Sequence, residues 1–250
     1  MTKVILPPNK LWTAYDTFLE SFRMAIEEAA GQVFFPDRPV AASFVASAHG
    51  IVEFRRCLYL KNLPSRKLSG KKRLDLVILG LESLERGSGQ HDRELWTLCK
   101  STVQLNYIVV GNSIGKLAQA LHFDFDQTGQ VDHPFFHVQL TDELIAADDC
   151  LRGHIDFKMQ KPTEQNECYV TTRIPTCDMT LASVLYCLAA DHLGGAIFNQ
   201  FAQKVDQLQD RLPPLRFDAL KSSVQKTTLH LKSFHWFAHM RTATASDKFS

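Results

Sequence analysis

Imidazole and carboxylate side chains recur at every second position in the middle of the chain. His122, Asp124 and Asp126 alternate with apolar residues, and His137 and Gln139 do so again after turn-forming residues at 127–130. Strand periodicity places such alternating side chains on one face of a sheet. Imidazoles with carboxylates bind divalent metals, and a metal-activated water beside a carboxylate base hydrolyses phosphodiesters. The pattern therefore indicates a candidate site for a metal-dependent phosphodiesterase or nuclease.

The roles in this candidate site follow from residue type. The carboxylates and imidazoles are the candidate metal ligands, and an arginine would stabilise the developing anionic charge. The candidate catalytic residues are Asp124, Asp126, His137 and Arg173, and the candidate metal ligands are His133, His137, Asp124 and Asp126. His154 and Asp156 alternate in the same way and would extend the polar face. The simpler interpretation, which we favour, is a solvated sheet face, because antiparallel sheets commonly turn one polar face to water.

A second motif is Gly111-Asn112-Ser113-Ile114-Gly115, which matches the G-x-S-x-G pattern. The β-prone stretch at 107–110 precedes it, and a helical pattern at 116–121 follows. In this order the motif resembles the nucleophile turn of α/β-hydrolases, which implies Ser113 as a catalytic nucleophile. The antiparallel pattern downstream argues against that fold, so a serine hydrolase is the least favoured of the functions considered.

A third feature is a basic segment. It contains Arg66, Lys67, Lys71, Lys72 and Arg73, with Arg55, Arg56 and Lys61 upstream. Such a segment attracts phosphates and makes nucleic-acid binding a candidate function. The alternative is a solvated loop and helix end.

The elements that must position these residues predict an α+β fold. We expect an N-terminal helical region at 1–118, a small central antiparallel sheet at 119–175 and two long C-terminal helices at 176–250, all in one domain. Helices are predicted at 9–30, 40–60, 71–85, 92–121, 178–212 and 215–241, and strands at 121–126, 136–140, 154–159 and 168–174. The β-prone stretch at 107–110, within the fourth helix, leaves a strand there as an alternative. Asp178 is the expected N-cap of the fifth helix, and Gly194-Gly195 is its expected kink.

Composition limits the class of protein. The chain has 250 residues, 45% hydrophobic and 22% charged, which is enough to form an unaided core and excludes a disordered or disulfide-stapled chain. The net charge of +1 gives no overall attraction to nucleic acid or anionic lipid. The six cysteines show no C-x-x-C pair, so we expect reduced thiols and a cytoplasmic location. The apolar runs are too short to cross a membrane, and we expect no membrane association.

Three motifs carry a family resemblance over roughly residues 120–195. They are Phe123-Asp124-Phe125-Asp126, His133-Pro134-Phe135-Phe136-His137 and Arg173-Ile174-Pro175 ahead of a long helix. Together they resemble an uncharacterised bacterial family whose members look like proteins encoded near restriction, phage-defence or toxin-antitoxin genes. This chain has His122 where that pattern has an arginine. The resemblance implies a bacterial cytoplasmic setting and a partner subunit, and it implies no reaction.

We therefore expect a cytoplasmic accessory or interaction subunit of a multi-protein, defence-related assembly. A protein partner is expected, with nucleic acid as an additional partner through the basic segment. The sequence requires no cofactor, whereas the alternative phosphodiesterase or nuclease would need a divalent metal ion. Whether the chain is an enzyme stays open at this point.

Overall fold

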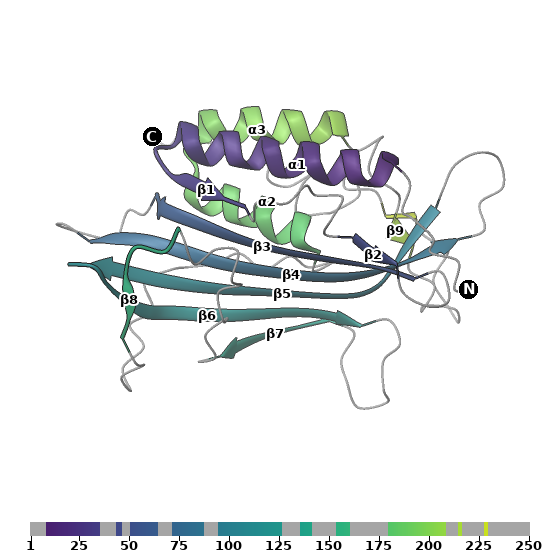
Figure 1. Cartoon of the computed structure of the whole chain (residues 1–250). Helices are drawn as coiled ribbons and strands as arrows, with labels where there is room; N and C mark the ends of the chain where they lie inside the picture. Colours follow the sequence, from purple (N-terminus) through teal and green to yellow (C-terminus); the bar gives the residue numbers. More distant parts are fainter. Residues whose placement is uncertain are drawn as a thin grey trace, which may run out of the picture.

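A curled, mostly antiparallel sheet with helices on one face dominates the computed structural model (Figure 1). The structure describes residues 9–35, 44–46, 51–64, 72–87, 95–126, 136–141, 154–160, 180–208, 215–216 and 228–229. Eight strands form the large sheet, whose main path runs β1-β3-β4-β5-β6-β7. Their bounds are β1 Gln32–Phe34, β2 Phe44–Ala46, β3 Ile51–Leu63, β4 Arg73–Gly87, β5 Leu95–Gly111, β6 Ile114–Asp126, β7 Phe136–Thr141 and β8 Lys158–Met159.

Three helices lie on the same side of this sheet (Figure 1): α1 Asn9–Glu28, α2 Leu181–His192 and α3 Gly195–Leu208. We call the sheet face under them the inner face and the opposite one the outer face. Helix α1 confirms the sequence prediction, since its three-and-four spacing of apolar residues places Phe18, Phe22 and Ile26 in the core. Gly31 follows the helix, and its amide donates to the Ile26 carbonyl at 3.0 Å.

The C-terminal helical stretch is broken where the sequence predicts a kink. Helix α2 ends at His192 and α3 begins at Gly195, with Gly194 between them. The N-cap differs from the predicted Asp178. Thr180 caps α2, because its hydroxyl accepts a hydrogen bond from the Ser183 amide at 3.1 Å.

The predicted helices at 40–60, 71–85 and 92–121 are wrong, because β3, β4 and β5 occupy these stretches and β6 begins at Ile114. The alternative strand at 107–110 is confirmed, since it lies within β5. The sheet is therefore not small, and most of the described residues of the region 1–118 are in strands. Strands β4 and β5 are 15 and 17 residues long, well above the usual strand length, which favoured helices at the sequence level. Apolar residues also cover both faces of these strands at one end, so their period of two is obscured. Leu76 and Ile78 face the helices, whereas Val77 lies in an outer cluster.

The predicted strands in the middle of the chain are confirmed only in part, and the last predicted helix is not confirmed. The antiparallel pairing of the strand at 121–126 with that at 136–140 is confirmed by β6 and β7. The predicted strand at 154–159 is reduced to β8, which pairs with β6 in parallel. The last predicted helix, 215–241, is wrong where the structure describes it, because Leu215–Arg216 (β9) and Thr228–Leu229 (β10) pair as short antiparallel strands. The predicted strand at 168–174 lies outside the described residues.

The space between the inner face and the helices is filled by large side chains. Its largest fully buried members are Phe18, Phe22, Phe54, Tyr107, Phe123, Phe125, Tyr186 and Phe201. Burying an aromatic or large aliphatic side chain contributes roughly 1.5–3 kcal/mol. This core joins α1, α2 and α3 to strands β3 to β6, so the N-terminal and C-terminal helices stabilise the same sheet.

The end of α2 contains a partly buried histidine. The His192 ring contacts the carbonyl of Pro64, with Nδ1 at 2.7 Å from the oxygen, and lies 6.0 Å from the Tyr107 ring centre. Its Nε2 is buried without a hydrogen-bond partner among the described residues. Burial lowers the pKa of His192 from its ordinary value of 6.5, and the bond to Pro64 opposes this only in part. The folded protein therefore favours the neutral ring.

This histidine predicts the direction of one pH effect. Below pH 6.5 the unfolded chain takes up a proton that the folded chain resists, so the free energy of unfolding falls as the pH drops below that value. Urea titrations at pH values from about 7.5 to about 5 measure it. His192→Asn keeps a donor for Pro64 and removes the titrating group, so the decline should be shallower in that variant. An identical pH dependence in both proteins would contradict this account.

Candidate functional site

The register of the sheet brings the polar residues of β5, β6 and β7 together on the outer face. Asp124 pairs with Thr102 on one side and with His137 on the other. The next row of the same face aligns Gln104, His122 and Gln139. The alternation along β6 therefore separates polar from apolar side chains, as the sequence predicts. Leu121, Phe123 and Phe125 enter the core, and the imidazole and carboxylate positions between them face the other way.

Two side chains converge on the Asp124 carboxylate. The Thr102 hydroxyl donates to Oδ1 at 2.7 Å, and Nε2 of His122 lies 3.1 Å from the same oxygen without hydrogen-bond geometry. The His122 and Asp124 side chains are 28% and 18% exposed. A half-buried carboxylate beside an imidazole can bind a cation or exchange a proton, and the hydroxyl fixes its orientation.

The remaining members of the predicted metal site are described only in part. For Asp126 and His137 the structure gives the backbone, in β6 and β7, whereas His133 and Arg173 lie outside the described residues. Among the described residues no three His, Cys, Asp or Glu side chains gather as a metal site would require. The register places the backbones of Asp124 and His137 side by side, and a metal bound between them stays a prediction.

Ser113 lies in a different setting from the one predicted for a hydrolase nucleophile. Asn112 and Ser113 have φ angles of 52° and 59° and form the tight turn between the antiparallel strands β5 and β6. Two successive residues with positive φ are typical of a type I′ hairpin turn. The predicted helix at 116–121 is wrong, since β6 continues there, so the strand-turn-helix arrangement of a nucleophile turn is not formed.

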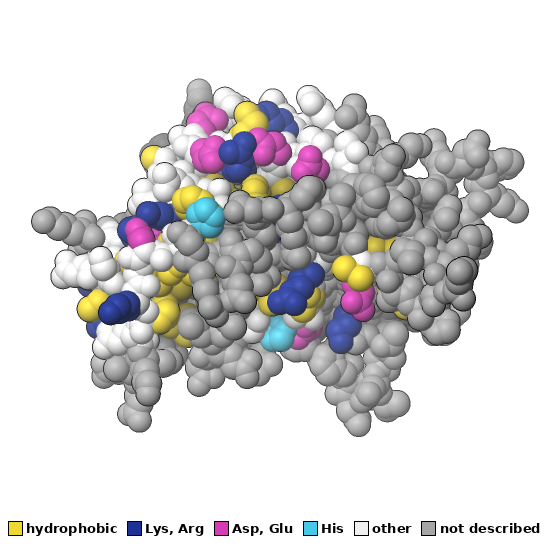
Figure 2. All heavy atoms as spheres, viewed as in Figure 1, with side chains coloured by type: hydrophobic (Ala, Val, Ile, Leu, Met, Phe, Trp, Pro, Cys, Tyr) yellow, Lys and Arg dark blue, Asp and Glu magenta, His cyan; other side chains and the backbone are white. Residues whose placement is uncertain are grey.

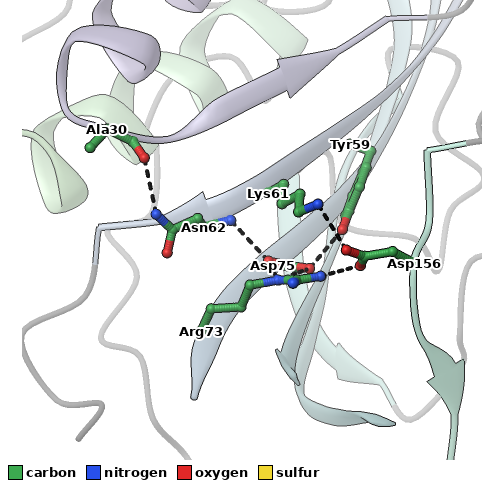
Figure 3. A network of polar contacts seen from close by, with 7 residues as sticks. All are labelled: Ala30, Tyr59, Lys61, Asn62, Arg73, Asp75 and Asp156. Atoms are coloured by element: carbon green, nitrogen blue, oxygen red, sulfur yellow. Dashed lines mark hydrogen bonds and ion pairs between the residues drawn. The ribbon is translucent and has the colours of Figure 1, made fainter. Parts of the chain in front are cut away.

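The basic segment is described only at its end. Arg66, Lys67 and Lys71 lie outside the described residues, Lys72 is exposed, and Arg73 begins β4. Arg73 is committed to ion pairs: its Nε lies 3.0 Å from both carboxylate oxygens of Asp75, and its guanidinium also contacts Asp156 (Figure 3). This arginine therefore has a structural partner on each side.

A polar network that no local sequence pattern predicts surrounds Asp75. Asp75 is fully buried and accepts hydrogen bonds from the Tyr59 hydroxyl at 2.6 Å and from the backbone N–H of Asn62 at 2.9 Å (Figure 3). Burial and the neighbouring carboxylate raise the pKa of Tyr59 well above its ordinary value, so its hydroxyl remains a donor. Lys61 donates to Asp156 at 2.8 Å, and these bonds from Lys61 and Arg73 lower the pKa of Asp156.

The ion pairs of Asp156 with Lys61 and Arg73 hold residues 154–160 across one end of the outer face. We call these residues the strap. Ile155, Phe157 and Met159 of the strap pack against an apolar cluster made of Cys57, Tyr59, Val77, Ile108 and Val110. Gly115 makes room for the strap, because a Cβ at that position would lie 2.4 Å from Cδ2 of Phe157. His154 and Asp156, which the sequence places on one polar face, therefore have different partners. Asp156 forms ion pairs with Lys61 and Arg73, and the His154 ring stacks on Phe34 with 4.6 Å between the ring centres.

Comparison with known proteins gives no further assignment. No family model, curated protein or solved structure matches this chain. Among the described helices, none is long and apolar enough to cross a membrane.

Proposed function

We propose that this chain is an interaction subunit that binds a partner protein through the outer face of β2, β3 and β4. The observation that supports it is the exposure of two aliphatic side chains there. Val45 is 59% exposed and Leu81 is 38% exposed, although both belong to strands of the main sheet. Large apolar side chains grouped on a surface with charged neighbours are typical of protein-binding sites.

The register places these two residues in one patch. Val45 pairs with Glu53, and Leu81 pairs with Arg55, so all four side chains belong to adjacent positions of the outer face. Glu53 and Arg55 are exposed as well. We call this set, Val45, Glu53, Arg55 and Leu81, the docking patch. It combines an apolar centre with one charge of each sign.

The chemistry of the patch selects the kind of partner. An apolar centre favours a protein surface with aliphatic or aromatic side chains, and the adjacent acid and base fix its orientation. The aromatic core closes the inner face, and the strap covers one end of the outer face. The docking patch belongs to the part of the outer face that is exposed. The family resemblance supports the same proposal, because it implies a partner subunit in a bacterial cytoplasm.

The test is capture of the partner by the tagged full chain from its native host at low salt, followed by mass spectrometry. We expect a stoichiometric protein whose retention is lost at least tenfold in Leu81→Asp, because a charge would then be buried against an apolar contact. Met24→Asp is the matched control, since Met24 is 48% exposed on α1 and lies outside the patch. Equal capture by the wild type and Leu81→Asp would overturn the proposal, as would equal loss in both variants.

A second candidate function is a metal-dependent phosphodiesterase or nuclease on the outer face of β5, β6 and β7. The pairing of Asp124 with His137 favours it, because directly paired residues of neighbouring strands have Cβ atoms roughly 5 Å apart. Mn²⁺- or Mg²⁺-dependent cleavage of a generic phosphodiester that is lost in His137→Ala would support this function. Unchanged metal binding in that variant would exclude the site.

A further inference from the structure

Charge is distributed unevenly over the described surface, although the chain as a whole carries only +1. Over residues 13–28, where its side chains are described, helix α1 exposes four carboxylates with a single arginine among them, and Figure 2 shows the acidic side chains gathered over this helix at the top of the view. These residues are Asp16, Glu20, Glu27 and Glu28, with Arg23. A compensating excess of positive charge is found at the end of the sheet where β5 turns into β6.

Three lysines from distant parts of the sequence lie near this turn. Lys116 follows it in β6, and Lys158 of β8 pairs with Ile114. Lys72 precedes β4, and its Cγ lies 3.6 Å from where a Cβ on Gly111 would be. All three lysines are exposed. With strands roughly 4.8 Å apart, they span about 15 Å across β4, β5, β6 and β8.

The described carboxylates at this end of the sheet already pair with other side chains. Asp75 is buried in its bonds with Tyr59 and Arg73, and Asp156 binds both Lys61 and Arg73. Within the part of the chain that the structure describes, the three lysines make no ion pair. Their charge is therefore available to a ligand, whereas that of Arg73 is not.

The neighbouring side chains define the chemistry of that ligand. Asn112 and Ser113 are exposed at the tip of the turn, and lysine, asparagine and serine side chains are among those that contact nucleic-acid phosphates. Protein interfaces are depleted in lysine, so an acidic protein fits this surface less well. We propose that this surface, made of Lys72, Lys116, Lys158, Asn112 and Ser113, binds the phosphate backbone of a nucleic acid without reading its sequence.

This phosphate-binding surface is separate from the docking patch. Lys72 and Leu81 are nine positions apart along the same strand direction, which corresponds to about 30 Å. A partner protein and a nucleic acid can therefore be bound together. Of the residues of the basic segment that the structure describes, Lys72 belongs to this surface and Arg73 does not, while Lys116 and Lys158 are contributed by the fold.

The test is fluorescence anisotropy with the full chain and a labelled random-sequence DNA duplex, at salt concentrations from about 50 to about 200 mM. Each phosphate contact contributes about 0.9 to the slope of log K against log salt, so the triple variant K72A/K116A/K158A should lose about 2.7 of slope. The corresponding single variants should each lose about 0.9. Lys204→Ala, which removes an exposed lysine from α3, is the matched control and should leave the slope unchanged.

Three results would overturn the proposal. The first is an equal slope in the wild type and in folded single variants, with folding checked by circular dichroism. The second is full competition by phosphatidylserine vesicles at equal charge, which would identify a lipid surface. The third is equally tight binding of polyglutamate, which would identify an acidic peptide. Loss of slope with partner capture intact would separate this surface from the docking patch.

Discussion

Glu82→Ala is expected to lower the free energy of unfolding by about 2–4 kcal/mol, because it leaves two buried donors without an acceptor. The Glu82 side chain is buried under the helices and accepts hydrogen bonds from the Tyr15 hydroxyl at 2.5 Å and from the Leu181 amide at 2.6 Å. Tyr15 belongs to α1 and Leu181 begins α2, so one carboxyl group of β4 joins both helices to the sheet. Urea unfolding followed by circular dichroism measures the loss.

Glu82→Gln is the matched control and should cost much less. The amide oxygen can still accept from the Leu181 amide, and the amide nitrogen can donate to the Tyr15 hydroxyl oxygen. A loss in Glu82→Gln as large as that in Glu82→Ala would contradict a hydrogen-bonding role and would point to the buried negative charge itself.

The same pair of proteins tests the ionisation of Glu82. Burial raises the pKa of Glu82 above its ordinary value of 4.5, and the two hydrogen bonds only partly oppose this. The folded state therefore binds the proton more tightly than the unfolded state, so wild-type stability should fall, relative to Glu82→Gln, as the pH rises from 4.5. A relative gain in stability over that range would mean that the carboxylate form is favoured in the fold.

Asp75→Ala is expected to have an equal or larger effect, about 3–5 kcal/mol, because it removes a fully buried carboxylate that accepts two hydrogen bonds and also pairs with the partly exposed Arg73. The substitution leaves the Tyr59 hydroxyl and the backbone N–H of Asn62 without their acceptor and removes the carboxylate beside Arg73. The strap packs on Tyr59, so limited proteolysis should cut within 154–160 sooner in this variant. Thermal unfolding gives the stability loss.

Asp156→Asn provides the matched control for Asp75→Ala. Asp156 also binds Arg73, but its side chain is 46% exposed, and exposed ion pairs contribute about 1 kcal/mol or less. We therefore expect a small, salt-dependent loss of stability in Asp156→Asn. Equal losses in the two variants would show that the network stabilises the fold through its exposed half, against the present account.

Part of the candidate site could be predicted from alternation alone. The period of two at 121–126 and 136–140 correctly paired β6 with β7, and it correctly separated His122 and Asp124 from the core residues Leu121 and Phe123. The pairing of Asp124 with Thr102 could not be predicted, because the pattern around Thr102 favours a helix over the strand β5. When a strand is predicted as a helix, none of its cross-strand neighbours can be predicted.

The sequence by itself determined the elements whose signals are local. Helix α1 has a regular amphipathic spacing, and the break between α2 and α3 coincides with two glycines. Tertiary structure alone decided that β3, β4 and β5 are strands, because leucine-rich segments are compatible with a helix until neighbouring strands satisfy their backbone hydrogen bonds. It also decided the contacts of Glu82, which reach 67 positions back to Tyr15 and 99 forward to Leu181. Contacts over such separations have no local pattern, so only the folded chain brings these groups together.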